Sequence, residues 1–122
     1  MKRIAVVDDE HDITIILKKA LEHHDHDFAV DTFNDPQAVL ATFQPSYYDL
    51  MIIDIRMPRM NGFDLYRELK KRDSGVRVCF LTAFEIYYEE FKKLFPTIDA
   101  KAFIRKPISI SNLVNQINAI IV

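Results

Sequence analysis

The sequence predicts an α/β fold in which a five-stranded parallel sheet carries helices on both faces. Short apolar runs alternate five times with segments whose apolar residues recur at helical spacing. The third run, Leu50–Ile53, is apolar throughout, as expected of a strand covered on both faces. A length of 122 residues fits one domain, spanning residues 1–122, with a sizeable buried core.

Two strands and two helices are predicted before that third run. The strand Ile4–Val7 stops at a pair of aspartates, and Ile13–Leu21 forms an apolar stripe at helical spacing. Polar residues 22–27 end this helix, and Phe28–Phe33 is the second strand. The triplet Asn34-Asp35-Pro36 begins a helix, because a capping side chain is followed closely by proline. The buried face of that helix consists of Val39, Leu40 and Phe43.

The second half of the chain continues the alternation. Its predicted elements are a helix that begins at Gly62, a strand over 76–81, a helix over 85–95 and a strand over 102–104. A fifth helix follows, and either Ser109 or Ser111 caps it. Right-handed crossovers and covered central strands are satisfied by the flavodoxin-like strand order 2-1-3-4-5, with helices and sheet forming three layers.

Polar residues follow the predicted strands at the edge where such sheets bind ligands. Asp8 and Asp9 follow the first strand, Asp54 the third, Thr82 the fourth and Lys106 the fifth. Three carboxylates that lie close together repel one another unless a cation is present. Mg²⁺ fits such a site, because it takes a few carboxylates and leaves room for phosphate oxygens. A carboxylate there can act as a nucleophile toward phosphorus.

Four motifs in this order resemble the receiver domain of two-component response regulators, a CheY-like domain, over essentially the whole chain. The motifs are Val6-Val7-Asp8-Asp9-Glu10, Asp54-Ile55-Arg56-Met57-Pro58 with Asn61-Gly62, Leu81-Thr82-Ala83, and Phe103-Ile104-Arg105-Lys106-Pro107. The resemblance implies a phosphoprotein in signal transduction, which accepts a phosphoryl group from the phosphohistidine of a histidine kinase, from a phosphotransfer protein or from a small phosphodonor. Such a domain is not an enzyme in the ordinary sense, since it catalyses only its own phosphorylation and dephosphorylation.

The resemblance also implies a role for each matching residue. Asp54 is the phosphoacceptor, and Lys106 holds the phosphoryl group, with a cis bond before the following proline. Asp9 binds Mg²⁺ directly, with Mn²⁺ as a possible substitute, and Asp8 helps largely through water. The backbone carbonyl of Arg56 is a further metal ligand. The switch pair consists of Thr82 and Phe103.

Two rival functions are open at this point. A haloacid dehalogenase-type phosphatase also uses an aspartate after an apolar strand, but it carries a second aspartate two residues on, where Arg56 stands here. A phosphorylation-independent pseudo-receiver is the main alternative. Such domains usually lose an acidic residue, the acceptor or the lysine, and all of these are present. Labelling by a small phosphodonor with and without Mg²⁺ discriminates between these functions.

Composition limits the partners and the compartment. A formal net charge of −2 gives no reason to expect direct nucleic-acid binding, and no apolar run is long enough to span a membrane. The lone Cys79, interpreted as a core residue, indicates a reducing cytoplasm. The segment 99–102 lacks the Gly-Ala-Asp-Asp run common in winged-helix regulators, which puts their usual DNA-binding dimer in doubt. An end at Val122, where the fifth helix should finish, fits a free-standing receiver and an excised one alike.

Three further features concern the surface. Aromatic residues over 87–95 give the predicted fourth helix an apolar arc that is wider than a minimal buried stripe. We expect the part of this arc outside the core to form a surface for a partner protein. A homodimer through the fourth helix, fifth strand and fifth helix is the simplest use of it. Arg56 and Phe84 are bulky beside the acceptor, which predicts slow self-dephosphorylation. The run of His23, His24 and His26 matches no metal-ligand spacing and is interpreted as a solvated loop.

Overall fold

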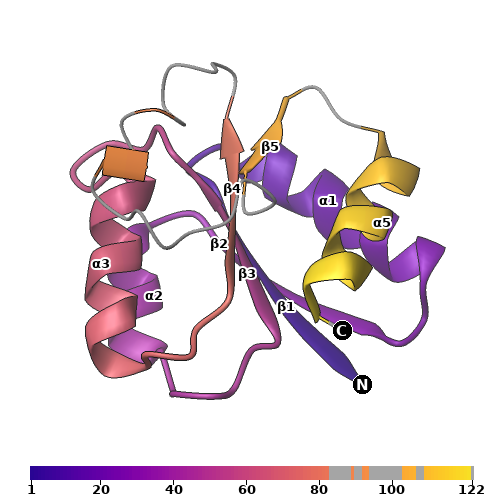
Figure 1. The fold of residues 1–122 in the computed structure, drawn as a ribbon. Helices are drawn as coiled ribbons and strands as arrows, with labels where there is room; N and C mark the ends of the chain where they lie inside the picture. Colours follow the sequence, from indigo (N-terminus) through magenta and orange to yellow (C-terminus); the bar gives the residue numbers. More distant parts are fainter. Residues whose placement is uncertain (83–88, 90–91, 94–102, 107–108, 122) are drawn as a thin grey trace.

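The computed structural model describes residues 1–82, 89, 92–93, 103–106 and 109–121 (Figure 1). In chain order its elements are β1 (Lys2–Val7), α1 (His11–His24), β2 (Phe28–Phe33), α2 (Pro36–Thr42), β3 (Leu50–Asp54), α3 (Gly62–Arg72), β4 (Val78–Thr82), β5 (Phe103–Arg105) and α5 (Ile110–Ile121). All strand pairs are parallel, and the order is β2-β1-β3-β4-β5. The predicted sheet, its strand order and the flavodoxin-like layers are therefore confirmed.

The sheet separates two apolar cores. Alternate residues of a strand point to opposite faces, so β1 sends Ile4 and Val6 to one core and Ala5 and Val7 to the other. α1 and α5 cover the first core, whereas α2 and α3 cover the second (Figure 1). Cys79 is fully buried in the first core, as predicted. No helix among the described residues is long and apolar enough to cross a membrane.

Most predicted boundaries hold within about two residues. α1 ends inside the polar segment 22–27, as predicted, but it continues through His23 to His24, which the sequence pattern places in a loop. Asp25 ends the helix by taking an extended conformation while its N–H donates to the carbonyl of Leu21. His23 and His24 are exposed in the last helical turn, and only His26 lies in the loop that follows.

Side-chain caps set the starts of α2 and α5. Asp35 accepts a hydrogen bond from the N–H of Gln37 and thereby caps α2. Of the two candidates for α5, Ser109 is the cap, since its hydroxyl accepts from the N–H of Asn112 at 3.2 Å and its carbonyl from Leu113. Of the helix predicted over 85–95, only Glu89, Lys92 and Lys93 are described, and these three are helical and exposed. The remainder, with its aromatic residues, lies outside the described residues.

Candidate functional site

The carboxyl ends of β1 and β3 bring Asp8 and Asp54 together. Val7 pairs with Ile53, so the residues that follow them, Asp8 and Asp54, stand at the same level on adjacent strands. β5 ends at Arg105 on the far side of β4, and Lys106 follows it. Three segments that are far apart in the sequence therefore contribute to one site, as the sequence predicts.

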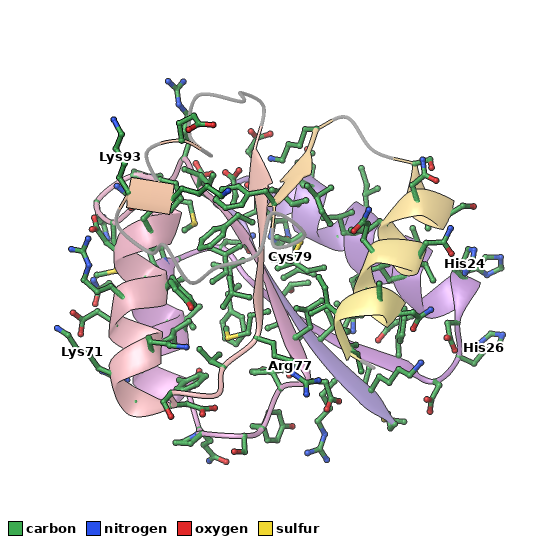
Figure 2. All side chains as sticks on the ribbon, in the orientation of Figure 1. His24, His26, Lys71, Arg77, Cys79 and Lys93 are labelled. Atoms are coloured by element: carbon green, nitrogen blue, oxygen red, sulfur yellow. The ribbon has the colours of Figure 1, made fainter. Side chains whose placement is uncertain are left out.

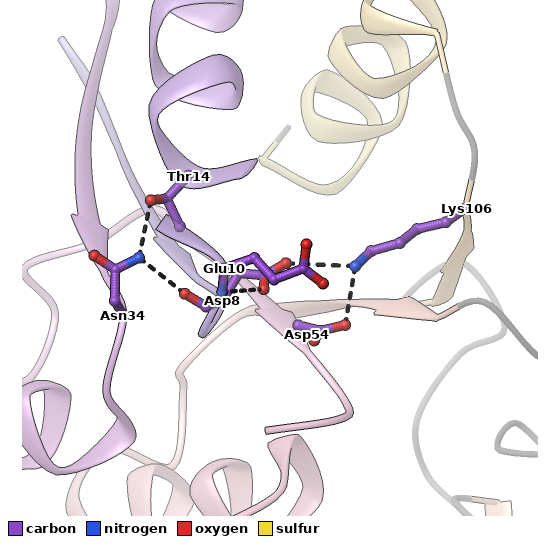
Figure 3. A network of polar contacts seen from close by, with 6 residues as sticks. All are labelled: Asp8, Glu10, Thr14, Asn34, Asp54 and Lys106. Atoms are coloured by element: carbon purple, nitrogen blue, oxygen red, sulfur yellow. Dashed lines mark hydrogen bonds and ion pairs between the residues drawn. The ribbon is translucent and has the colours of Figure 1, made fainter. Parts of the chain in front are cut away.

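Lys106 extends its ammonium group between two buried carboxylates (Figure 3). Its Nζ lies 3.1 Å from Oδ1 of Asp54 and 3.4 Å from Oδ2 of Asp8. The residue exposures of Asp8 and Asp54 are 1% and 8%, whereas Asp9 is exposed at the rim. One ammonium group thus serves two carboxylates that are almost completely removed from water.

The pKa values of Asp54 and Lys106 are both raised within the cluster. Burial and the neighbouring carboxylate of Asp8 raise the pKa of Asp54 from 3.8 to about 6, although Lys106 opposes the change. Burial lowers the pKa of Lys106, but the carboxylates of Asp54 and Asp8 outweigh it and raise that pKa above its usual 10.5. For Asp54 burial is the largest cause and the carboxylate of Asp8 adds to it, whereas for Lys106 the two carboxylates that share its ammonium group outweigh burial.

A divalent cation fits this arrangement. Carboxylate oxygens of Asp8, Asp9 and Asp54 all lie within 4.8 Å of one another. A second positive group would relieve the repulsion that raises the pKa of Asp54, and oxygen ligands are those that Mg²⁺ prefers. Asp9 has no hydrogen bond or ion pair within the described part of the chain, so its carboxylate is available as a ligand. The acidic cluster can therefore bind Mg²⁺.

The backbone around Asp54 is fixed by the start of α3. The N–H of Gly62 donates to the carbonyl of Ile55 at 2.8 Å, and Asn61 caps the helix through the N–H of Asp64. A Cβ at Gly62 would lie 2.5 Å from the carbonyl oxygen of Asp54, closer than real Cβ atoms come. The glycine of the motif is therefore required for α3 to approach the backbone of Asp54.

Asn34 also contributes to the site, although its place in the sequence predicts only a helix start. Its Nδ2 donates to the backbone carbonyl of Asp8 and to Oγ1 of Thr14, both at 3.0 Å (Figure 3). The N–H of Glu10 donates to Oδ1 of Asp8, also at 3.0 Å. These bonds fix the loop that carries the acidic pair. The sequence offers no signal for the two bonds of Asn34, because they join segments 26 and 20 residues apart.

Several predicted residues are only partly located. Thr82 ends β4 opposite Arg105, but its side chain lies outside the described part of the structure, as do Phe84 and Pro107. Arg56 is exposed in the loop that follows Asp54. Phe103 is half-buried, and its ring centre lies 5.4 Å from that of Phe80 in the core beneath α3.

Side chains elsewhere form no second metal cluster in the described ranges. Figure 2 shows His24 at the C-terminal end of α1 and His26 just beyond it, both on the outside of the molecule. Among the described residues, the group of Asp8, Asp9 and Asp54 is the one set of potential metal ligands that converges. The interpretation of the histidine run as solvated is consistent with this arrangement.

Comparisons with known proteins agree with the geometry. A model of the response regulator receiver domain matches residues 4–118. The response regulator SaeR of Staphylococcus aureus is 30% identical over 118 residues, which cover 97% of this chain and 50% of that protein. The chain thus spans about half the length of the curated relatives it matches.

Solved structures give the same result. The non-phosphorylated HemR receiver domain of Leptospira biflexa superposes with a TM-score of 0.84 at 26% identity, covering 99% of this chain and 94% of that one. The response regulator TrrA of Thermotoga maritima, solved in complex with Mg²⁺ and BeF, superposes with a TM-score of 0.78 at 27% identity, covering 98% and 99%. The chain belongs to the receiver-domain family of the response regulators of two-component systems.

Proposed function

We propose that Asp54 accepts a phosphoryl group from the phosphohistidine of a histidine kinase, from a phosphotransfer protein or from a small phosphodonor. The observation that carries the proposal is the placement of the Lys106 ammonium 3.1 Å from Oδ1 of Asp54, within a cluster of three carboxylates. Receiver domains are signalling modules, and this one turns over only its own phosphoryl group. The lone buried cysteine supports a cytoplasmic location.

The chemistry follows from the positions of the side chains. A carboxylate oxygen of Asp54 attacks phosphorus, and the bond from phosphorus to the donor imidazole nitrogen breaks with its electron pair on nitrogen. Lys106 moves from carboxylate to phosphoryl oxygen and neutralises charge there. Mg²⁺, when bound by Asp8, Asp9, Asp54 and the backbone carbonyl of Arg56, supplies further charge neutralisation, and Mn²⁺ substitutes for it.

A phosphorylation-independent interaction module is not favoured. Such a module does not need Asp54 in a buried position, where burial opposes ionisation of the carboxylate. It also does not need the Lys106 ammonium group beside that carboxylate. Burial of the carboxylate costs stability, and a reaction at that carboxylate accounts for its retention. An external phosphatase activity is likewise not supported, because Arg56 occupies the position of the second aspartate that such enzymes use.

We further propose that phosphorylation changes the face formed by the segment 85–95, β5 and α5, most simply in a phosphorylation-favoured homodimer. Thr82 and Phe103 form the switch. The contact of Phe103 with Phe80, and its ring-centre distance of 6.5 Å from Phe63 at the start of α3, support a path from the acceptor to β5. A ligand shifts such an equilibrium only through its differential affinity for the two states, and the phosphoryl oxygen supplies that difference at Thr82.

Labelling with acetyl phosphate tests the acceptor proposal. The intact mass of the wild-type chain should increase by one phosphoryl group in Mg²⁺ and should not change in a metal chelator. Asp54→Asn should abolish labelling, whereas Asp49→Asn, which alters a carboxylate just before the opposite end of β3, should not. Full labelling of Asp54→Asn, or labelling that is independent of metal, contradicts the proposal.

A further inference from the structure

A cavity lies at the edge of the sheet formed by β2, beside the end of α2. It has a volume of about 330 Å³ and shares no residue with the acidic cluster. Its lining residues come from β2, α2 and the connection to β3; they are Asp31, Phe33, Thr42, Gln44, Tyr47 and Tyr48. Three of these six residues are aromatic, and one carries a negative charge.

The aromatic rings form a corner with Tyr48 at its centre. The ring of Tyr48 stands nearly perpendicular to that of Phe33, with centres 6.5 Å apart, and to that of Tyr47, with centres 4.9 Å apart. The guanidinium of Arg3 already lies 4.5 Å from the centre of the Tyr47 ring. Ring faces attract cations through their quadrupole, so this cluster holds one organic cation from the chain itself.

Asp31 places an exposed negative charge beside the rings. Its Oδ2 accepts a hydrogen bond from the hydroxyl of Tyr48 at 2.7 Å, which fixes the carboxylate. Across the described residues it forms no ion pair with a lysine or arginine, and its Oδ1 has no partner. Burial and this hydrogen bond raise the pKa of Tyr48, so its phenol remains a donor throughout the physiological range.

The backbone that carries the two tyrosines is held on both sides. The N–H of Ser46, a residue with a φ of 63°, donates to Asp73 at 2.9 Å. On the other side, Asp49 and Arg3 exchange two hydrogen bonds of 2.8 Å, from the N–H of Asp49 to a carbonyl and from the N–H of Arg3 to a carboxylate. A binding site whose walls are already ordered loses little entropy when it is filled.

We propose that this cavity binds the basic side chain, an arginine or a lysine, of a partner protein. Oδ1 of Asp31 accepts from the guanidinium or ammonium group, and the rings of Tyr48 and Phe33 pack against its aliphatic stem. Exposed Thr42 and Gln44 form a polar margin around the aromatic centre, the arrangement found in protein interfaces. An acidic or neutral side chain lacks the positive charge that pairs with Asp31.

A titration followed by NMR of the whole chain tests this proposal. The probes are N-acetyl-arginine methylamide and the citrulline analogue, which has nearly the same shape but no charge. With Mg²⁺ present to occupy the acidic cluster, the arginine probe should cause saturable shifts at Asp31, Tyr47 and Tyr48. We expect a dissociation constant of about 1 mM, and binding of the citrulline probe at least about fivefold weaker.

Variants locate the binding group. Asp31→Asn and Tyr48→Phe should each weaken binding of the arginine probe at least about fivefold, the second because the carboxylate loses its anchor. Asp27→Asn, an exposed carboxylate outside the cavity, should not change it. Labelling by acetyl phosphate should be normal in Asp31→Asn, so the outcome is independent of the proposed phosphorylation.

Four results would overturn the proposal. The first is equal affinity for the two probes, and the second is the absence of saturable shifts up to about 50 mM. The third is a set of shifts centred on Asp9 and Asp54, which places the cation in the acidic cluster. The fourth is micromolar binding of free butylguanidinium, which assigns the cavity to a small-molecule ligand instead of a protein side chain.

Discussion

Replacement of Asp54 by asparagine should stabilise the metal-free protein at neutral pH. The pKa of Asp54 in the folded chain is about 6, compared with 3.8 for the free group. A raised pKa means that the folded state holds the proton more tightly, so stability is lost as the pH rises from about 4 through about 6. The difference between the two pKa values corresponds to a loss of about 3 kcal/mol at pH 7. Asparagine cannot ionise, so Asp54→Asn avoids this loss.

Urea denaturation in a metal chelator measures the effect. At pH 7 the free energy of unfolding of Asp54→Asn should exceed that of the wild type by up to about 3 kcal/mol, and the two should converge near pH 4. Mg²⁺ at a hundredfold excess over its dissociation constant should restore about 2.7 kcal/mol to the wild type alone. Glu68→Gln, which removes an exposed helical ion pair with Lys71, is the control and should change stability by less than about 0.5 kcal/mol. The reasoning fails if Asp54→Asn is no more stable at pH 7, or if its advantage persists at pH 4.

Three further outcomes are expected. Gly62→Ala should destabilise the chain by about 1–3 kcal/mol in thermal or urea unfolding, because its Cβ would lie 2.5 Å from the carbonyl oxygen of Asp54; a neutral change contradicts this. Asp9→Asn should weaken Mg²⁺ binding more than Asp8→Asn in a fluorescence titration, because both Asp8 oxygens already have protein partners; the reverse ranking refutes it. Thr82→Ala should still accept phosphate, but beryllofluoride should shift few amides of β5 and α5 in its NMR spectrum, and a full response excludes Thr82 as the switch.

The sheet and the acidic site were predictable because both depend on local patterns. Continuous apolar runs such as Leu50–Ile53 identify strands, and the rule that parallel strands bind ligands at their carboxyl ends brings Asp8, Asp54 and Lys106 to one edge. No knowledge of loop conformation is needed for that step. The structure adds the distances and the burial, which decide how strongly the three charges interact.

Features that depend on contacts between loops were not predictable. The hydrogen bonds of Asn34 to Asp8 and Thr14 require the loops after β1 and β2 to lie side by side. The cavity around Tyr48 is lined by residues of β2, α2 and the connection to β3, which have no periodic relation in the sequence. His23 and His24 belong to α1 and not to the loop after it, a difference that the sequence does not mark because neither glycine nor proline stands at the helix end.

Peptide mapping of the phosphorylated chain tests the central claim most directly. Reduction of an aspartyl phosphate with borohydride converts the residue to homoserine, which mass spectrometry detects at a defined position. After treatment with acetyl phosphate and Mg²⁺, homoserine should appear at position 54 and at no other aspartate. Homoserine at position 8 or 9, or its absence from a chain whose intact mass shows the phosphoryl group, would contradict the assignment of Asp54 as the acceptor.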